Sequence, residues 1–256
     1  MTYPVFKIIH CSGCYSYLIG CPETRQAVLV DPKVGRTADY LNFLSLYGLR
    51  LGAVVDTHTH ADHLSTSTVF AKDGVELWMS HRSACQRPRR PLGDGDELGV
   101  GNLRFRALEL PGHTPDSIAL YGHGMVLTGD SLFVGGLARA DFRGSDPAAL
   151  FDSVKEKLMA LPDETLVFPG HGYNDILFST IGTERASNPA LRHASGRDYA
   201  AALGAVEGRG NTPDVDRVLA LNLEADPELP ESAGTAAACC AAPGAGGGDL
   251  GIRQVL

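Results

Sequence analysis

The sequence has no apolar run near the roughly 20 residues that a membrane-spanning helix needs, so we expect no membrane partner. It also has no excess of basic charge. Its 22 Lys and Arg stand against 30 Asp and Glu, and the net charge of −8 disfavours nucleic acid as the main partner. The six cysteines show no paired zinc or redox spacing, because the CxxC at Cys11 and Cys14 has no strand-to-helix context. The start of the chain has no charged-then-apolar signal pattern, and we expect a reduced, cytoplasmic protein.

The overall amino-acid composition is that of an ordinary globular protein. The 256 residues are 44% hydrophobic and 20% charged. We expect a catalytic domain at residues 1–224 and a separate tail at 225–256. The stretch 225–248 is rich in Ala, Gly and Pro and contains the pair Cys239-Cys240. Such a composition can bury little apolar surface, so we predict a flexible tail.

The segment 57–63 is the densest cluster of functional groups, with three His and one Asp within seven residues. A short apolar stretch at 51–55 predicts a buried strand before it, and residues 64–72 predict a helix after it. If the segment continues the strand, His58 and His60 point to the same side, and a turn after Ala61 brings Asp62 and His63 to the same centre. Imidazole and carboxylate together suit zinc, iron or manganese.

The pattern of an apolar strand followed by a potential ligand recurs along the chain. His58 follows 51–55, His113 follows 103–110, Asp130 follows 125–127, and His171 follows 165–168. Ligands of layered α/β proteins gather at the ends of strands. We therefore predict one metal-bearing edge. Another charged feature, the Arg-rich run 87–90, could bind an anion, but we expect a solvated loop there.

Four motifs identify a family resemblance. HTHADH at 58–63, PGHT at 111–114, TGD at 128–130 and PGH at 169–171 resemble the metallo-β-lactamase superfamily, in family order. The resemblance, which runs from about residue 5 to 193, implies an α/β fold, the αββα sandwich, with metals at one edge of its two sheets. Asp130 stands where the β-lactamases proper carry Cys, which disfavours antibiotic hydrolysis. Two branches remain, the glyoxalase II thioesterases and the persulfide dioxygenases.

Two stretches favour the persulfide dioxygenases. The segment 136–142 resembles the Gly-Arg-Thr-Asp-Phe of that branch, and the run 171–189 is close to its sequence after the last His. Glyoxalase II holds glutathione with basic residues near its C-terminus, whereas here no Lys follows Lys157. The chain departs from the family at Thr66, where Gly is usual, and at Ala190, where Arg is frequent.

The resemblance implies oxidation of glutathione persulfide by O2 and water to sulfite and glutathione, at one Fe(II) per chain. His58, His113 and Asp130 would form the two-His, one-carboxylate face that holds the iron. Four further groups would hold waters, orient the ligands or shape the pocket: His60, Asp62, His63 and His171. The candidates for binding the glutathione portion are Arg139, Tyr173 and Arg192.

Three alternatives stay open at this point. In the glyoxalase II interpretation, the same seven groups bind two metals such as zinc, and a bridging hydroxide attacks a thioester. A metal- or thiol-binding protein without activity would be expected to have lost ligands, yet all seven are present. Arg139 could instead form a structural salt bridge with Asp141. A homodimer of this chain is also compatible with the sequence.

Overall fold

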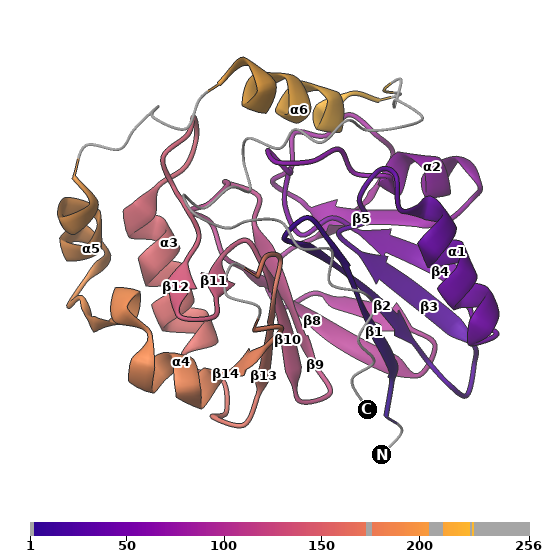
Figure 1. Ribbon diagram of the computed structural model, residues 1–256, viewed down its shortest axis with the longest axis horizontal. Helices are drawn as coiled ribbons and strands as arrows, with labels where there is room; N and C mark the ends of the chain where they lie inside the picture. The colour runs from indigo at the N-terminus through magenta and orange to yellow at the C-terminus, as the bar shows by residue number, and fades with distance from the viewer. Residues whose placement is uncertain (1–2, 173–175, 205–211, 226, 228–256) are drawn as a thin grey trace.

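The structure is a computed structural model that describes residues 3–172, 176–204, 212–225 and 227. Two six-stranded sheets are stacked against each other (Figure 1). The first sheet has the order β1 (Val5–Cys11), β2 (Cys14–Gly20), β3 (Gln26–Val30), β4 (Arg50–Val55), β5 (Glu76–Ser80) and β6 (Arg90–Leu92). The second has the order β14 (Ser179–Thr180), β13 (Leu166–Pro169), β10 (Met125–Gly129), β9 (Ile118–Gly122), β8 (Leu103–Glu109) and β7 (Glu97–Val100).

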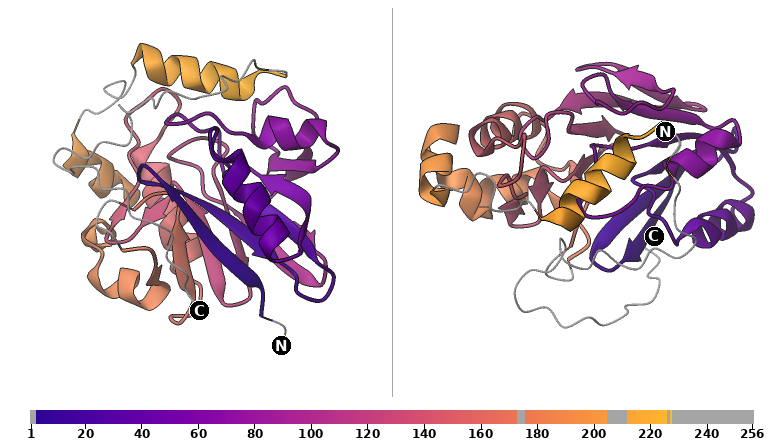
Figure 2. Two further views of the ribbon diagram at one scale, coloured as in Figure 1. Left: turned by 45° about the vertical axis from the view of Figure 1, so that its right-hand side comes forward. Right: turned by 90° about the horizontal axis from the view of Figure 1, so that it is seen from above.

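Helices cover the outer faces of both sheets. The helices packed on the first sheet are α1 (Thr37–Leu46) and α2 (Ser67–Lys72). Beside the second sheet lie the helices α3 (Pro147–Ser153), α4 (Ile181–Ser187) and α5 (Gly196–Leu203). The same side carries a short two-stranded sheet, β11 (Leu132–Phe133) and β12 (Gly136–Leu137), a π-helical turn at Val154–Leu158 and a 3-10 turn at Pro189–Arg192. The last helix, α6 (Pro213–Leu223), crosses above the edges of both sheets (Figure 2).

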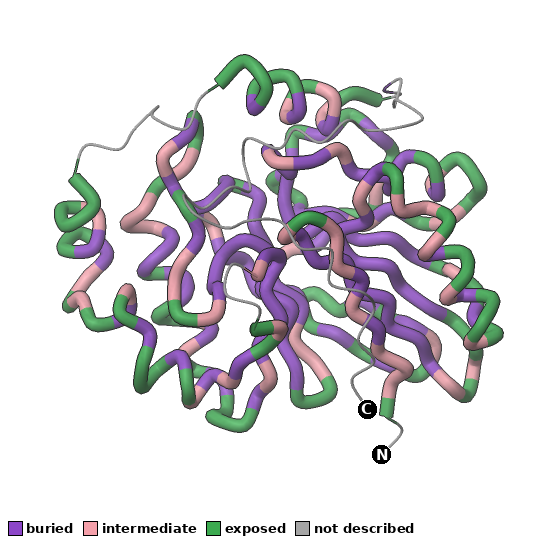
Figure 3. The backbone as a smooth tube through the Cα atoms, in the orientation of Figure 1, coloured by how far each residue is buried: buried purple, intermediate pink, exposed green. Residues whose placement is uncertain are grey.

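Three hydrophobic clusters hold these layers together. One lies between the two sheets and includes Tyr17, Phe105 and Leu127. A second joins the second sheet to α3 through Phe151, and a third joins the first sheet to α1 through Tyr40. The strands are buried along most of their length, whereas the exposed residues concentrate on the helices and turns (Figure 3). This order of layers confirms the predicted αββα sandwich.

Parallel pairing brings the ends of distant strands together. β3 pairs with β4 in parallel, with Val30 opposite Val55, so the residues that follow both strands leave the sheet at the same edge. β10 pairs with β13 in parallel, with Leu127 opposite Phe168. The segments that carry Asp130 and His171 therefore emerge side by side, as the pattern of strand followed by ligand predicts.

Two local features differ from the sequence prediction. The helix expected from residue 64 begins only at Ser67, because residues 64–66 still belong to the functional loop. The solvated loop expected at 87–90 leads into strand β6, which begins at Arg90, and the side chain of Arg87 is buried. In the part of the chain that is described, no helix combines the length and apolar character that a membrane span requires.

Deleting residues 228–256 is expected to change the free energy of unfolding by less than about 0.5 kcal/mol, as for surface changes away from packed features. All three hydrophobic clusters are built from residues before 224, and Pro227 is still buried, so the deletion starts after it. The tail predicted at 225–256 lies almost wholly outside the described residues. Urea unfolding of both proteins checks this, and a loss of several kcal/mol would show that the tail packs on the body.

Candidate metal centre

The structure brings together the three residues proposed as ligands. The Nε2 atom of His58 lies 4.0 Å from Oδ2 of Asp130, and Nε2 of His113 lies 3.7 Å from the same oxygen. One ligand atom from each residue lies within 4.8 Å of the other two, and all three side chains are buried. They come from three different strand ends, after β4, β8 and β10, so only the folded sandwich assembles them.

Hydrogen bonds fix which nitrogen each imidazole presents. Thr57 donates its hydroxyl proton to Asp31 at 2.8 Å, so its oxygen can accept from Nδ1 of His58 at 3.0 Å. Nδ1 of His113 donates to the backbone carbonyl of Arg139 at 2.8 Å. In both rings the Nε2 lone pair is therefore turned toward Asp130. Such contacts are what orient the histidine ligands of metal sites.

The protonation states suit a cation. Burial and the neighbouring His60 lower the pKa of His58 to about 3, so its imidazole is neutral and its lone pair is available. Burial likewise lowers the pKa of His113. Burial alone would raise the pKa of Asp130, but the adjacent His171 and the other histidines outweigh it and hold that pKa well below its usual range. Two neutral imidazoles and a carboxylate are the donor set of a two-His, one-carboxylate site.

His171 links two carboxylates on the other side of Asp130. Its Nδ1 lies 2.8 Å from Oδ1 of Asp130, and its Nε2 lies 3.0 Å from Oδ2 of Asp62. Burial opposes charge on this ring, but the two carboxylates raise the pKa of His171 well above its usual value. His63 contacts the same oxygen of Asp62 through Nδ1 at 2.9 Å. These residues form a second group around Asp62, continuous with the first through Asp130.

His60 faces a different carboxylate. Its Nε2 lies 3.2 Å from Oδ1 of Asp31, at ion-pair distance, and its ring packs against that of His58 with centroids 4.2 Å apart. Burial would lower the pKa of His60, but the charge of Asp31 outweighs it and raises the pKa to about 10. Its Nδ1 lies 4.0 Å from Oδ1 of Asp62, so His60 lies between Asp31 and Asp62 and also forms a possible metal-binding group with His58 and Asp62.

The loop that carries HTHADH is shaped by side chains and not by a strand. β4 ends at Val55, so His58 and His60 do not continue it as the sequence predicts. Instead Asp31 accepts from the backbone N–H of Thr57 at 2.7 Å, and Asp116 accepts from the N–H of Thr59 at 3.3 Å and from its hydroxyl at 2.6 Å. Sequence reasoning missed both carboxylates, and the position of Asp31 directly after β3 was the only signal for it.

Cys14 is a further residue that sequence reasoning undervalued. Its Sγ lies 3.3 Å from Oδ2 of Asp62, and Nζ of Lys33 lies 3.4 Å from that sulfur. Cys14 pairs with Cys11 across the turn between β1 and β2, which confirms that this CxxC lacks the strand-to-helix context of a redox motif. It nevertheless places a buried thiol at the border of the metal centre.

The candidate substrate residues are less closely tied to the centre. The guanidinium of Arg139 forms a bidentate salt bridge with Asp141 at 2.6 and 3.1 Å, while its backbone carbonyl is the partner of His113. Arg192 is exposed at the end of the 3-10 turn. Tyr173 lies outside the described residues. The salt bridge considered as an alternative for Arg139 is thus present.

Buried nitrogen atoms without a hydrogen-bond partner indicate whether a cation would fit this site. Among the histidines of the described residues, Nε2 of His58, both ring nitrogens of His60 and Nε2 of His63 are buried without a hydrogen-bond partner in the protein. Buried polar atoms are almost always hydrogen-bonded, so such atoms call for a ligand. They lie within the groups whose donor atoms converge within 4.8 Å. The residues present therefore fit a metal cofactor.

Sequence comparison agrees with this geometry. The pattern of the metallo-beta-lactamase superfamily matches residues 11–171, which is more than half of the chain. The fold and the converging His and Asp residues define a metal-binding αββα protein, and the chain belongs to the metallo-beta-lactamase superfamily.

Comparison with individual proteins shows which members of the superfamily the chain resembles. It is 35% identical over 191 residues to the human mitochondrial persulfide dioxygenase ETHE1, covering 73% of this chain and 74% of that protein. A probable hydroxyacylglutathione hydrolase of Schizosaccharomyces pombe is 34% identical over 190 residues, covering 71% and 72%. The crystal structure of ETHE1 from Myxococcus xanthus superposes with a TM-score of 0.79 at 34% identity, covering 85% of this chain and 97% of that one.

Proposed function

We propose that this protein is a persulfide dioxygenase that oxidises glutathione persulfide with O2 and water to glutathione and sulfite. The observation that carries the proposal is the similarity to a persulfide dioxygenase over about three quarters of both chains, together with the convergence of His58, His113 and Asp130. The reaction balances as a four-electron oxidation of the outer sulfur by one O2. Water supplies the third oxygen of sulfite, and the S–S bond breaks to release the thiol.

The proposed metal is a single Fe(II) held by His58, His113 and Asp130. Two imidazoles and one carboxylate on one face are typical of non-haem iron oxygenases, because they leave other positions open. Fe(II) bound there would supply the activation of O2, which protein side chains alone do not provide. Asp130 contributes the negative charge, and the hydrogen bonds of Thr57 and the Arg139 carbonyl keep both Nε2 atoms aimed at the centre.

The remaining groups keep the site polar and ordered. His171 donates to Asp130 and thereby fixes the direction of its carboxylate. The carboxylate of Asp62 is fixed by its contacts with His171 and His63. Both contacts are made between protein side chains, so they do not require the iron. We keep Arg139, 40% exposed at its side chain, as a candidate for the glutathione carboxylates, since a guanidinium can exchange Asp141 for a ligand carboxylate of the same geometry.

A thioester hydrolase is the second candidate, because Asp62 and His171 converge with Asp130 beside the first group, and His63 contacts the same oxygen of Asp62 as His171 does. That set could hold a second metal, and the hydrolase relative is nearly as similar in sequence. In such an enzyme a metal-activated water attacks the thioester. Ligand geometry alone therefore does not separate the two reactions, and an assay must do so.

The deciding assay measures O2 uptake and sulfite release by the same iron-loaded sample. We expect O2 consumption that depends on glutathione persulfide, with one sulfite formed per O2. Hydrolysis of S-lactoylglutathione should be slow, because a mononuclear centre lacks the second metal of the hydrolases. The Asp130→Ala protein is the control for uncatalysed persulfide oxidation. Rapid thioester hydrolysis without O2 uptake would overturn the assignment in favour of a glyoxalase II activity.

A further inference from the structure

One residue of the C-terminal helix contacts the metal-binding loop in three places. Asn222 lies at the end of α6 and is only 4% exposed. Its Nδ2 donates to the backbone carbonyl of His60 at 2.9 Å and to that of His63 at 2.8 Å. Its Oδ1 accepts from the backbone N–H of Ser65 at 3.0 Å. Both donors of the carboxamide and its oxygen are thus engaged by one loop.

These contacts matter because the loop has little support of its own. Residues 56–64 form neither helix nor strand, so few of their backbone groups have partners in a regular ladder. A buried carbonyl without a partner is costly, and Asn222 satisfies two of them at once. The two carbonyls flank Asp62, so the spacing between them sets where Asp62 and His63 lie relative to His60.

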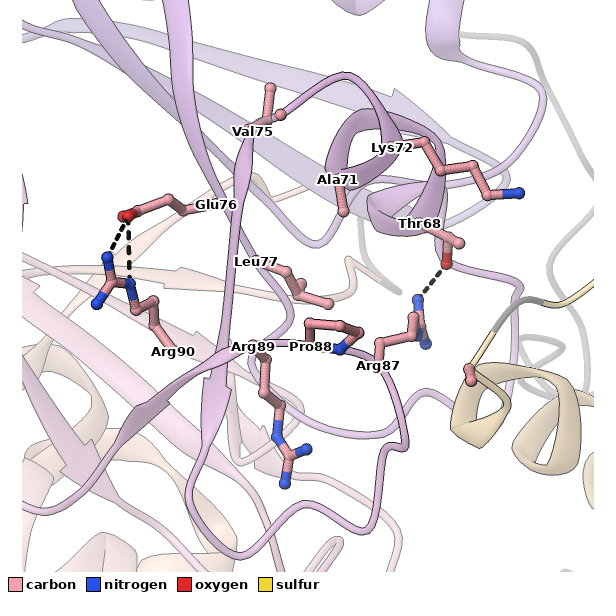
Figure 4. A pocket seen from close by; sticks show the side chains of 12 residues that line it. Thr68, Ala71, Lys72, Val75, Glu76, Leu77, Arg87, Pro88, Arg89 and Arg90 are labelled. Atoms are coloured by element: carbon pink, nitrogen blue, oxygen red, sulfur yellow. Dashed lines mark hydrogen bonds and ion pairs between the residues drawn. The ribbon is translucent and has the colours of Figure 1, made fainter.

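The backbone of Asn222 is in turn held by the buried side chain of Arg87. The guanidinium of Arg87 donates to Thr68 at the start of α2 (Figure 4). It also donates to the Asn222 backbone carbonyl and contacts Ser67 at 3.1 Å. Ser67 in turn donates at 2.7 Å to Asp56, the first residue of the metal-binding loop. Arg87 is only 4% exposed. Its hydrogen bonds are therefore used inside the protein, and not for an anion in the cavity that Arg87 lines together with Thr68 and Leu77.

We propose that Asn222 is a positioning residue of the metal centre, through which α6 sets the shape of the HTHADH loop. The proposal rests on the metal site of the proposed function. Asn222 would touch neither metal nor substrate, and it would act through the backbone of His60, His63 and Ser65. Helix α6 is then part of the working site, although it lies beyond all four ligand motifs in the sequence.

The test measures metal affinity in Asn222→Ala and Asn222→Leu with Co(II) as the probe, in competition with a chromophoric chelator. Leu has nearly the shape of Asn, so it fills the space of the carboxamide if the Ala protein fails to fold. We expect affinity to fall about 10- to 100-fold in both, the range for partners that orient metal ligands. The visible absorption of bound Co(II) should also shift, because the ligand geometry relaxes.

Val218→Ala is the matched control, because Val218 lies one turn earlier on α6 and is buried without a polar contact to the loop. It should lower the melting temperature of the metal-free protein but change Co(II) affinity less than twofold. Wild-type affinity in both Asn222 variants, or an equal loss in Val218→Ala, would overturn the proposal. Since the measurement uses no substrate, weak metal binding only in the Asn222 variants would stand even if the O2 assay refuted the dioxygenase.

Discussion

Asp130→Ala is expected to yield protein without bound metal, whereas His60→Ala should retain much of its metal. Asp130 is the carboxylate on which His58 and His113 converge, at 4.0 and 3.7 Å, and its removal deletes the negative charge of the site. His60 instead lies 3.2 Å from Asp31. Replacing it should disturb the loop without removing one of the three proposed ligands. Metal analysis of anaerobically purified protein measures both effects.

The same analysis tests the number of metals. We expect one iron per chain in the parent protein. Asp130→Asn serves as the matched control, because it keeps the shape of the side chain while removing its charge, and it should also lose most of the metal. Equal loss in the Asp130 and His60 variants, or two metals per chain in the parent, would contradict the mononuclear site and favour the dinuclear arrangement.

Much of the fold was predictable because its signals are local. Buried strands such as Leu103–Glu109 show their alternation in the sequence, and Asp146 caps α3 through its side chain as the Asp-Pro pair indicates. The sandwich itself followed from the family resemblance of the four motifs, which lie at the strand ends. The same motifs predict the convergence of His58, His113 and Asp130.

The rest of the site depends on contacts that no local pattern encodes. Asn222 meets Ser65 across 157 positions, and Asp116 meets Thr59 across 57. An ordinary Asn near the end of an amphipathic helix carries no signal of such a contact. The prediction of a solvated loop around Arg87 was wrong for the same reason. An Arg-rich run is typical of a solvated surface, and only the contacts of Arg87 with α2 and α6 show that it is enclosed.

The glycines before the ligands are explained by close packing rather than by flexibility. Gly129 precedes Asp130 with φ +50°, and a Cβ there would lie 2.5 Å from Oγ1 of Thr57. Gly170 precedes His171, and a Cβ there would lie 2.3 Å from Oδ1 of Asp130. At these two positions the glycine before the ligand thus allows two strand ends to come together around one carboxylate.

Gly170→Ala is therefore expected to weaken metal binding strongly, although it alters no ligand. The backbone at this position is held on both sides, since its N–H donates to Gly129 at 2.8 Å and its carbonyl accepts from Tyr15 at 2.8 Å. The added methyl must then displace the Asp130 carboxylate from His171, because the strands cannot separate without losing these bonds. Overpacking of this kind typically costs about 1–3 kcal/mol of folding stability. Metal affinity should fall at least as far as for a lost orienting contact, about 10- to 100-fold.

Gly136→Ala provides the comparison, because a Cβ at Gly136 meets no atom within 4 Å. Both variants are compared by Co(II) affinity and by the melting temperature of the metal-free protein. Gly136→Ala should match the parent in both, whereas Gly170→Ala should lose affinity and stability together. Should Gly170→Ala bind Co(II) as tightly as the parent, the position of the Asp130 carboxylate would not control the metal, and its proposed place between His58, His113 and His171 would be wrong.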